Sequence, residues 1–486
     1  MGYLLKKDQL STTNMFNNTR MTPHFLPSKP FLLLLLTGLL GSVMAQTPHD
    51  FSLNEAIRFA TQQNLNVKNT QLDALSAEAR IKEVKGLALP QINVGASATY
   101  NAIIQKFIFP AGGFGAPVDS TSTGGGSSNG DDVTAIPFGV KYQGSVAANV
   151  NQLIFDASYK IGLRAAATYR ELAQKNIAAS KINVAEQVAK AYYGVLVSTE
   201  RLKLLDLNIT RVDTLLRETR AMNSQGFVEK IDIDRLEVQL NNLKTDRQNV
   251  KNLVDLSYNL LKFQMGLPIN APIQLTDQIE TYSQQDLERA AVLDSAFDYG
   301  QRIEFSTLQT QITLADLDYQ SIGKQYYPRL TAAATYGHNN GRNNFMDFWT
   351  TQWFNSAAIT LNLNVPVFDG FQKRYAAQQR KIAIDKARQS GELLKNSIDL
   401  QIRQATVTLS NNLQTLQSQK RNMDLAQEVV RVTRIKYKEG VGSNIEVLNA
   451  ETSFREAQTN YFSSLLDYMI TKVDLDKALG KLYTGQ

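Results

Sequence analysis

The stretch of sequence that decides the fold is Arg434-Ile-Lys-Tyr-Lys-Glu-Gly-Val-Gly-Ser-Asn-Ile-Glu-Val-Leu-Asn-Ala-Glu451. Helical spacing of apolar residues leads into this stretch and continues beyond it, and only the segment Gly440-Val-Gly-Ser443 interrupts the pattern. Glycine adopts a positive φ at little cost, so two glycines within three positions indicate a helix C-cap and a tight turn. Ser443 and Asn444 are suitable N-caps for the next helix. The stretch therefore predicts the tip of a hairpin of two α-helices.

A fainter copy of this tip occurs 214 residues earlier, at Ala221-Met-Asn-Ser-Gln-Gly-Phe-Val-Glu-Lys-Ile-Asp-Ile-Asp-Arg-Leu-Glu237. Four positions match at this constant offset: Gly226 with Gly440, Ile231 with Ile445, Asp232 with Glu446, and Glu237 with Glu451. The segments Leu153-Ile-Phe-Asp156 and Pro366-Val-Phe-Asp369 recur at almost the same offset. We therefore predict an internally duplicated chain.

Composition excludes several classes of function. The chain has 486 residues and no cysteine, so it has no disulfide, thiolate metal site or cysteine nucleophile. A formal charge of +6 over this length is too balanced to argue for nucleic-acid binding. The three histidines, His24, His49 and His338, are far apart in the sequence and form no metal-binding or catalytic pattern. We expect no enzyme activity, no metal site and no cofactor.

The N-terminal region has the pattern of a secretory signal peptide. Lys29 precedes the apolar run 31–40, and Val43-Met-Ala45 ends before Gln46. We assign residues 1–45 to a signal peptide with an N-terminal extension, in which Met21 is an alternative start to Met1. A buried N-terminal helix is the other interpretation. No later stretch is apolar enough for a transmembrane helix, so any insertion into a membrane must use strands.

Residues 46–270 read as a first repeat. A helix stops at Pro90, because the residue before a proline is pushed out of helical geometry. Apolar and polar residues then alternate over two predicted strands, 90–108 and 138–155, which flank a Gly/Ser-rich segment interpreted as a mobile loop. A long helical hairpin follows, with its tip at 224–230. Its apolar positions recur every seven residues, as in a coiled coil: Val188, Val195, Leu202, Ile209 and Leu216.

Residues 271–300 form a predicted linker, and residues 301–486 repeat the programme. The second repeat has a helix, strands at 329–338 and 356–367, and a helical hairpin with its tip at 439–444. Aromatic residues are concentrated in the loop between these two strands, at Phe345, Phe348, Trp349, Trp353 and Phe354. Such a loop is typical of an aromatic belt at a membrane surface, with a receptor for phage as the alternative.

The predicted fold class is mainly α with transmembrane β. Each repeat offers two amphipathic strands of about ten residues, which is long enough to cross an outer membrane when the strands are tilted. Four strands cannot close a barrel, for which about eight is the practical minimum, and open edges are not tolerated in lipid. Several copies would therefore have to share one barrel. A soluble sheet that caps a coiled coil is the alternative.

The tip motifs and the two Phe-Asp segments resemble those of the TolC family of outer membrane efflux and secretion channels, over nearly all of the mature chain. The resemblance implies a homotrimer with a twelve-stranded barrel in outer membrane lipid and an α-helical barrel in the periplasm. It also implies a periplasmic adaptor protein and an inner-membrane pump as partners. The function implied is a passive exit duct of a tripartite efflux or type I secretion system. An exported coiled-coil scaffold without channel activity is the alternative.

The same resemblance assigns roles to residues at both tips. Adaptor docking would use Gly226, Phe227 and Val228 in one turn, and Gly440, Val441 and Gly442 in the other. The Val-Gly-Leu or Val-Gly-Thr turn usual in the family is absent from both tips. A closed gate would use Glu446, with Asp232 and Tyr437 as a linking pair between helices.

The gate pattern is incomplete, because Asn449 replaces a second expected acid and Gly442 replaces an expected arginine. A ring of three Glu446 carboxylates would favour cations. The alternative for Glu446 and Asp232 is an ordinary helix start, where the helix dipole favours acids. Packing in the heptad seam is the alternative for Tyr437.

Overall fold

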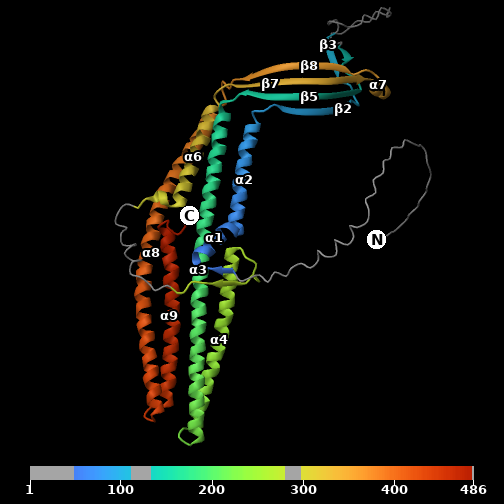
Figure 1. The fold of residues 1–486 in the computed structure, drawn as a ribbon. Helices are drawn as coiled ribbons and strands as arrows, with labels where there is room; N and C mark the ends of the chain where they lie inside the picture. Colours follow the sequence, from blue (N-terminus) through green and yellow to red (C-terminus); the bar gives the residue numbers. More distant parts are fainter. Residues whose placement is uncertain (1–48, 111–132, 280–296, 484–486) are drawn as a thin grey trace, which may run out of the picture. The chain divides into compact units, whose positions relative to one another are not determined.

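A computed structural model describes residues 49–110, 133–279 and 297–483 (Figure 1). The chain divides into two units, Met1–Thr47 and Pro48–Gln486, and only the second contains described residues. The predicted signal peptide and most of the Gly/Ser-rich segment lie outside the described ranges. Among the helices that are described, none combines the length and apolar character needed to cross a membrane.

The first repeat begins with two helices where the sequence predicts one. Helix α1 (Leu53–Gln63) ends at Asn64, and α2 (Leu65–Gly86) begins directly after it. The Asn64 side chain accepts a hydrogen bond from the Asn66 amide at 2.8 Å and donates one to the Gln264 carbonyl at 2.8 Å. A capping asparagine thus interrupts a helical pattern that is otherwise continuous. Before α1, strand β1 (His49–Phe51) pairs in parallel with β6 (Ile273–Leu275).

Four long strands form one antiparallel sheet in the order β2-β5-β7-β8. Their bounds are β2 Gln91–Tyr100, β5 Tyr142–Phe155, β7 Arg329–Arg342 and β8 Phe354–Asn364. Strands of the first repeat therefore pair directly with strands of the second, through β5 and β7. The described sheet has two edges, β2 and β8.

The strand predicted over 90–108 is wrong in its second half. β2 ends at Tyr100, where Asn101 turns the chain: its backbone amide donates to the Lys141 carbonyl at 2.7 Å and its side chain donates to the Val140 carbonyl at 2.9 Å. The following strand, β3 (Lys106–Pro110), pairs with β4 (Val133–Pro137) in a separate two-stranded sheet.

The strands of the second repeat also differ from their predicted bounds. β7 runs to Arg342, past the predicted end at residue 338, because its pairing with β5 continues. β8 begins at Phe354 and ends at Asn364, before Pro366. The segment predicted as an aromatic loop contains a short helix, α7 (Phe345–Thr350).

The register gives the four-stranded sheet one apolar and one polar face. Paired residues point to the same face, so the rows through Ile92 and Val94 define an apolar face. Its members include Ile92, Val94, Val150, Ala148, Ala334, Ile359 and Leu361. The opposite face carries Asn93, Ser97, Asn149, Thr335, Thr360 and Asn362. The large apolar side chains of β2 and β8 are exposed, so the described residues leave this apolar face uncovered along these two strands.

Two long helical hairpins extend from the sheet. The first consists of α3 (Ala157–Ser224), capped by the Asp156 carboxylate, and α4 (Lys230–Met265). The second consists of α8 (Gln372–Lys438) and α9 (Asn444–Ala478), and α6 (Ile303–Lys324) packs against α3 and α8. At about 1.5 Å per residue, α3 is about 100 Å long. Each tip therefore lies at the C-terminal end of its long helix, α3 or α8, which is the end far from the sheet (Figure 1).

Heptad positions form the apolar seams of the hairpins. In the second hairpin, Leu409 and Leu416 of α8 are fully buried in a cluster that includes Leu465 and Met469 of α9. In the first hairpin, Val212 and Leu216 of α3 pack in a cluster with Leu236 and Leu240 of α4. Burying each such side chain contributes roughly 1.5–3 kcal/mol.

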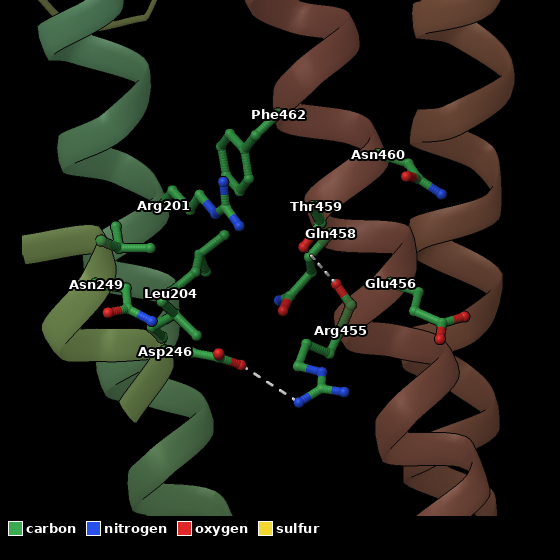
Figure 2. A pocket seen from close by; sticks show the side chains of 12 residues that line it. Arg201, Leu204, Asp246, Asn249, Arg455, Glu456, Gln458, Thr459, Asn460 and Phe462 are labelled. Carbon is green, nitrogen blue, oxygen red and sulfur yellow. Dashed lines mark hydrogen bonds and ion pairs between the residues drawn. The ribbon is translucent and has the colours of Figure 1, made fainter. Parts of the chain in front are cut away.

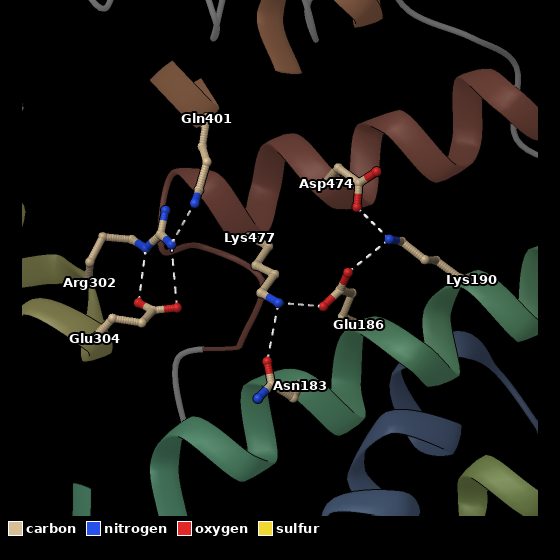
Figure 3. Close-up of polar contacts among 8 residues, drawn as sticks. All are labelled: Asn183, Glu186, Lys190, Arg302, Glu304, Gln401, Asp474 and Lys477. Atoms are coloured by element: carbon tan, nitrogen blue, oxygen red, sulfur yellow. Dashed lines mark hydrogen bonds and ion pairs between the residues drawn. The ribbon is translucent and has the colours of Figure 1, made fainter. Parts of the chain in front are cut away.

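A polar network fixes the C-terminal end of α9 to its neighbours (Figure 3). Lys190 of α3 bridges the Glu186 carboxylate at 2.8 Å and the Asp474 carboxylate at 2.5 Å, and Lys477 binds the other Glu186 oxygen at 2.5 Å. On the other side, Arg302 donates to the Ala478 carbonyl at 2.8 Å and to Glu304 at 3.1 Å. The network therefore joins the start of α6 to α3 and α9.

The charges of this network shift the pKa of two of its members. Burial alone would raise the pKa of Glu186, but hydrogen bonds from Lys190 and Lys477 outweigh it and place that pKa below its ordinary value of 4.5. Burial alone would lower the pKa of Lys190, but Asp474 and Glu186 raise it above 10.5. Because the pKa of Glu186 is lower in the folded chain than in the unfolded chain, the ionised carboxylate stabilises the fold at every pH above the unfolded pKa. This contribution is lost as the pH falls through the folded pKa.

We predict that Glu186→Gln lowers the free energy of unfolding by about 2 kcal/mol at pH 7, because charged hydrogen bonds are replaced by neutral ones. The difference from the wild type should persist down to about pH 4.5 and shrink below it, as Glu186 of the wild type becomes protonated. Thermal unfolding followed by circular dichroism at several pH values measures this. Glu200→Gln, which alters an exposed pair with Lys203, is the control. Equal effects of the two substitutions would contradict the assignment.

Candidate functional site

The two predicted tips have the same backbone geometry. Gly226 and Gly440 both adopt the left-handed conformation, with φ of 78° and 74°. The amide of the next residue then donates back to the last turn of the helix, from Phe227 to the Met222 carbonyl and from Val441 to the Lys436 carbonyl, each at 3.0 Å. This arrangement is the Schellman motif. A residue with a Cβ atom in place of the glycine would strain it. The matching geometry agrees with an internal duplication.

Each tip presents one large apolar side chain to solvent. Phe227 and Val441 follow the two glycines, and both are 78% exposed. Val228 instead packs against the cluster of the first hairpin. Gly442 has a different constraint from Gly440, since a Cβ atom there would lie 3.0 Å from both the Lys436 Cβ and the Tyr437 amide nitrogen. The expected arginine at this position would therefore crowd the turn.

The predicted linking pair is not joined directly in the described structure. Tyr437 of α8 is buried among side chains of the first hairpin, and its hydroxyl lies 3.4 Å from the Thr219 hydroxyl. Burial raises the pKa of Tyr437. The Asp232 carboxylate accepts a hydrogen bond from Asn444 of α9 at 3.0 Å, and the same amide reaches the Asp232 carbonyl at 3.0 Å. Each residue thus connects the two hairpins, but through a different partner.

Glu446 lies in the first turn of α9, one turn after the capping Ser443. Its side chain is exposed, and no hydrogen bond or ion pair holds its carboxylate within the described ranges. The helix dipole favours an acid at this place, as the alternative interpretation holds. In the described residues there is also no group of three or more His, Asp or Glu arranged to bind a metal ion.

The sequence did not reveal the strongest polar contact between the hairpins. Arg211 of α3 forms a two-pronged ion pair with Glu451 of α9, with Nε–Oε1 and Nη2–Oε2 distances of 3.0 and 2.8 Å. Glu451 is only 4% exposed. Asn208 continues this contact, accepting from Arg211 at 2.9 Å and donating to the Gln458 amide oxygen at 2.6 Å. We call the contact between Arg211 and Glu451 the inter-hairpin ion pair.

Two further features surround the inter-hairpin ion pair. Arg434 of α8 donates to the Arg211 carbonyl at 3.2 Å, and its buried Nε atom has no partner among the described residues. Burial lowers the pKa of Arg434. One sequence signal was available, because Glu451 is a charged residue beside the apolar row that contains Val447 and Phe454. The matching Glu237 of the first tip behaves differently, since it forms only an exposed pair with Arg220 at 3.3 Å.

A groove of about 520 Å³ lies between the two hairpins (Figure 2). The Arg455 side chain of α9 crosses it to the Asp246 carboxylate of α4 at 3.3 Å. Arg201 and Asn249 line it from the first hairpin, and Glu456 lines it from the second. The lining is mixed, because Leu204, Leu205, Val250 and Phe462 also contribute to it. The seams within each hairpin are more uniformly apolar.

We predict that Glu451→Gln lowers the free energy of unfolding by about 3 kcal/mol, because it leaves the Arg211 charge half-buried without its partner. Replacing both partners, by Arg211→Met with Glu451→Leu, should cost clearly less than the single change. Thermal unfolding of Arg211→Met, of Glu451→Leu and of the double variant, alongside Glu451→Gln, measures the coupling. Glu428→Gln breaks an exposed pair with Arg431 and should have little effect. A double variant as unstable as the sum of its single changes would contradict the prediction.

Known proteins resemble this chain in sequence and fold. Residues 301–481 match the family described as outer membrane efflux protein. The chain is 21% identical to outer membrane protein TolC of Vibrio cholerae over 338 residues, covering 70% of this chain and 77% of that protein. It is also 21% identical to TolC of Escherichia coli over 485 residues, covering 93% and 86%.

Solved structures give the same result for the fold. VceC of Vibrio cholerae, an outer membrane protein, superposes with a TM-score of 0.64 at 14% identity, covering 88% of this chain and 96% of that one. CusC superposes with a TM-score of 0.64 at 13% identity, covering 90% and 95%. The comparisons confirm the family resemblance and the predicted fold class, and the matched relatives are outer membrane proteins.

Proposed function

We propose that this chain, a TolC-like outer membrane efflux protein, is the outer membrane duct of a tripartite efflux or type I secretion system. One observation carries the proposal: the same chain combines a sheet with an exposed apolar face and two helical hairpins whose longer helices, α3 and α8, are each about 100 Å long. The sheet would lie in the membrane, and the hairpins would extend the duct into the periplasm. Small molecules or proteins would pass passively from the pump to the exterior.

The edges of the sheet support a homotrimer. β2 and β8 each have one side unpaired within the described chain, and the hydrocarbon core of a bilayer offers no water to satisfy their backbone groups. Three copies would pair β8 of one chain with β2 of the next and close a twelve-stranded barrel. The polar face would then line the lumen, and the apolar face would contact lipid.

The tips support docking of a periplasmic adaptor protein that connects the duct to an inner-membrane pump. Phe227 and Val441 occupy equivalent positions, are strongly exposed and sit on rigid turns. Exposed apolar side chains at a fixed position are suitable anchors for a partner protein. A coiled-coil scaffold that only spans the envelope would not need the apolar sheet face, so that alternative explains less of the structure.

The same end of the duct would carry the gate. In a trimer, three Glu446 carboxylates would form a ring at the start of α9. Tyr437, Asp232 and the inter-hairpin ion pair would hold the hairpins of each chain together around this ring. Three like charges in a narrow passage would attract cations and repel anions.

Conductance of the purified protein tests the duct and its gate together. We expect a trimer by mass measurement in detergent and cation-selective conductance in planar bilayers. Glu446→Gln should reduce both the cation selectivity and the block by multivalent cations, because it removes three charges from the ring. Glu439→Gln removes a neighbouring exposed acid and serves as the control. A monomer, or no conductance, would contradict the duct; unchanged selectivity in Glu446→Gln would contradict only the ring.

Adaptor docking is tested by changing the two exposed tip residues. We expect Phe227→Ser combined with Val441→Ser to weaken cross-linking to a periplasmic adaptor protein of the host cell by at least about tenfold, since hot-spot residues each contribute about 2 kcal/mol or more. Unfolding temperature and conductance should not change, because both side chains are exposed. Val407→Ser alters an exposed apolar residue far from the tip and is the control. Unchanged cross-linking would exclude these side chains as anchors.

A further inference from the structure

Helix α7 folds back onto the apolar face of the four-stranded sheet. Phe348 is only 4% exposed, and its ring lies over Gly144 of β5. A Cβ atom at Gly144 would lie 2.5 Å from the Phe348 Cζ and 2.8 Å from the Trp353 Cη2, so only glycine leaves room for both rings. Gly144 pairs with Ala98, which belongs to the row of Val94 and Ala96. The two rings therefore cover the apolar face and not the polar one.

Hydrogen bonds and ring contacts hold α7 in this position. The buried Asn340 side chain of β7 donates to the Phe348 carbonyl at 2.7 Å, and Arg342 donates through Nε to the Thr351 hydroxyl at 2.9 Å. The Phe345 ring lies 5.5 Å from the Tyr142 ring, between centroids. The helix is thus attached to both β5 and β7, although it has only six residues.

One flank of α7, next to the buried Phe348, also carries apolar side chains that stay largely exposed. Phe345, Met346 and Trp349 are 55%, 67% and 62% exposed. At 100° per residue these three side chains occupy one continuous arc of the helix, whereas Asp347 and Thr350 lie on the remaining side. The Phe345 ring contacts the Tyr142 ring, and the Trp349 ring lies 5.1 Å from the Phe348 ring, between centroids. Both side chains nevertheless remain more than half exposed on a well-anchored element. Such an arrangement is suited to a second apolar surface.

We propose that α7 is an interfacial helix that inserts Phe345, Met346 and Trp349 among the lipids at the outer surface of the outer membrane. The inference rests on the proposed function, which places the apolar sheet face in lipid. α7 is continuous with that face, and it joins the ends of β7 and β8 that lie farthest from α6 and α8. It therefore lies where the hydrocarbon meets the headgroups. Aromatic side chains favour this depth, with Asp347 and Thr350 on the water side.

The two tryptophans of the chain make this inference directly measurable, because both belong to this segment, at positions 349 and 353. Trp353→Phe leaves Trp349 as the single fluorophore. In vesicles of phospholipid brominated on the acyl chain just below the headgroup, Trp349 should lose most of its emission, and dissolved iodide should have little effect. Trp349→Phe leaves only Trp353, which packs beside Phe348 over Gly144, and its quenching by bromine should be weaker.

A third variant tests whether the anchoring of α7 on the sheet is what brings Trp349 into contact with lipid. Phe348→Ala removes the ring that anchors α7, so quenching of Trp349 by brominated lipid should fall and quenching by iodide should rise. Quenching of Trp349 by iodide alone in the Trp353→Phe protein would overturn the proposal and favour a water-exposed segment. Protection from both quenchers would also overturn it and would indicate cover by a second copy of the chain.

Conductance of the same vesicles distinguishes this inference from the proposed function. A conducting channel with Trp349 in water would reject the interfacial helix and leave the duct intact. Failure of the protein to insert or conduct would reject the duct, and the interfacial helix with it.

Discussion

The constraint on which the rest of the structure depends is the pairing of strand backbones. The sheet carries both an apolar face and a polar face, and its edge strands β2 and β8 retain unpaired groups within one chain. In water those groups would bind solvent, but in lipid each would cost several kcal/mol. In the proposed outer membrane location, the edges would therefore have to pair between copies. The helical hairpins, which continue directly from the strands, must follow the same symmetry.

The contacts within each hairpin differ in kind from those between the hairpins. Fully buried residues such as Leu409 and Leu416 lie in a seam within one hairpin, so each hairpin is held by the hydrophobic effect. Between the hairpins, near the tips, contacts such as Arg455–Asp246 and Arg211–Glu451 are polar. Water can replace polar partners at a modest net cost, whereas it cannot replace buried leucines. The contact between hairpins is nevertheless not wholly polar, because Tyr437 and Val447 of the second hairpin are buried in the apolar cluster of the first.

The parts of the fold that could be predicted from sequence are those set by local chemistry. Gly226 and Gly440 determine their turns through their own φ angles, and the heptads determine which helix faces are buried. The break at Asn64 could not be predicted, because the apolar helical pattern passes through it and its cap depends in part on a contact with Gln264, far along the chain. The end of β2 at Asn101 likewise depends on carbonyls about 40 residues away.

The site was less predictable than the fold for a related reason. Arg211 and Glu451 are 240 residues apart, and their contact depends on the rotational setting of two long helices. Tyr437 contacts Thr219 and not Asp232, and this depends on where the Tyr437 hydroxyl points in a packed interface. Family resemblance directs attention to this level of the hairpins, but hydrogen-bond partners are decided by atoms within about 3 Å.

In the proposed trimer, opposing forces would meet at the tips. Three Glu446 carboxylates brought into one ring repel one another, so the ring by itself favours an open passage. Closure must then come from contacts between hairpins, which here are Tyr437–Thr219, Asp232–Asn444 and the inter-hairpin ion pair. A polar contact of this kind contributes only about 1 kcal/mol net, and somewhat more where a charge is involved. A partner that binds Phe227 and Val441 more tightly when the hairpins are apart needs little differential affinity to open the duct, because the forces it must overcome nearly cancel.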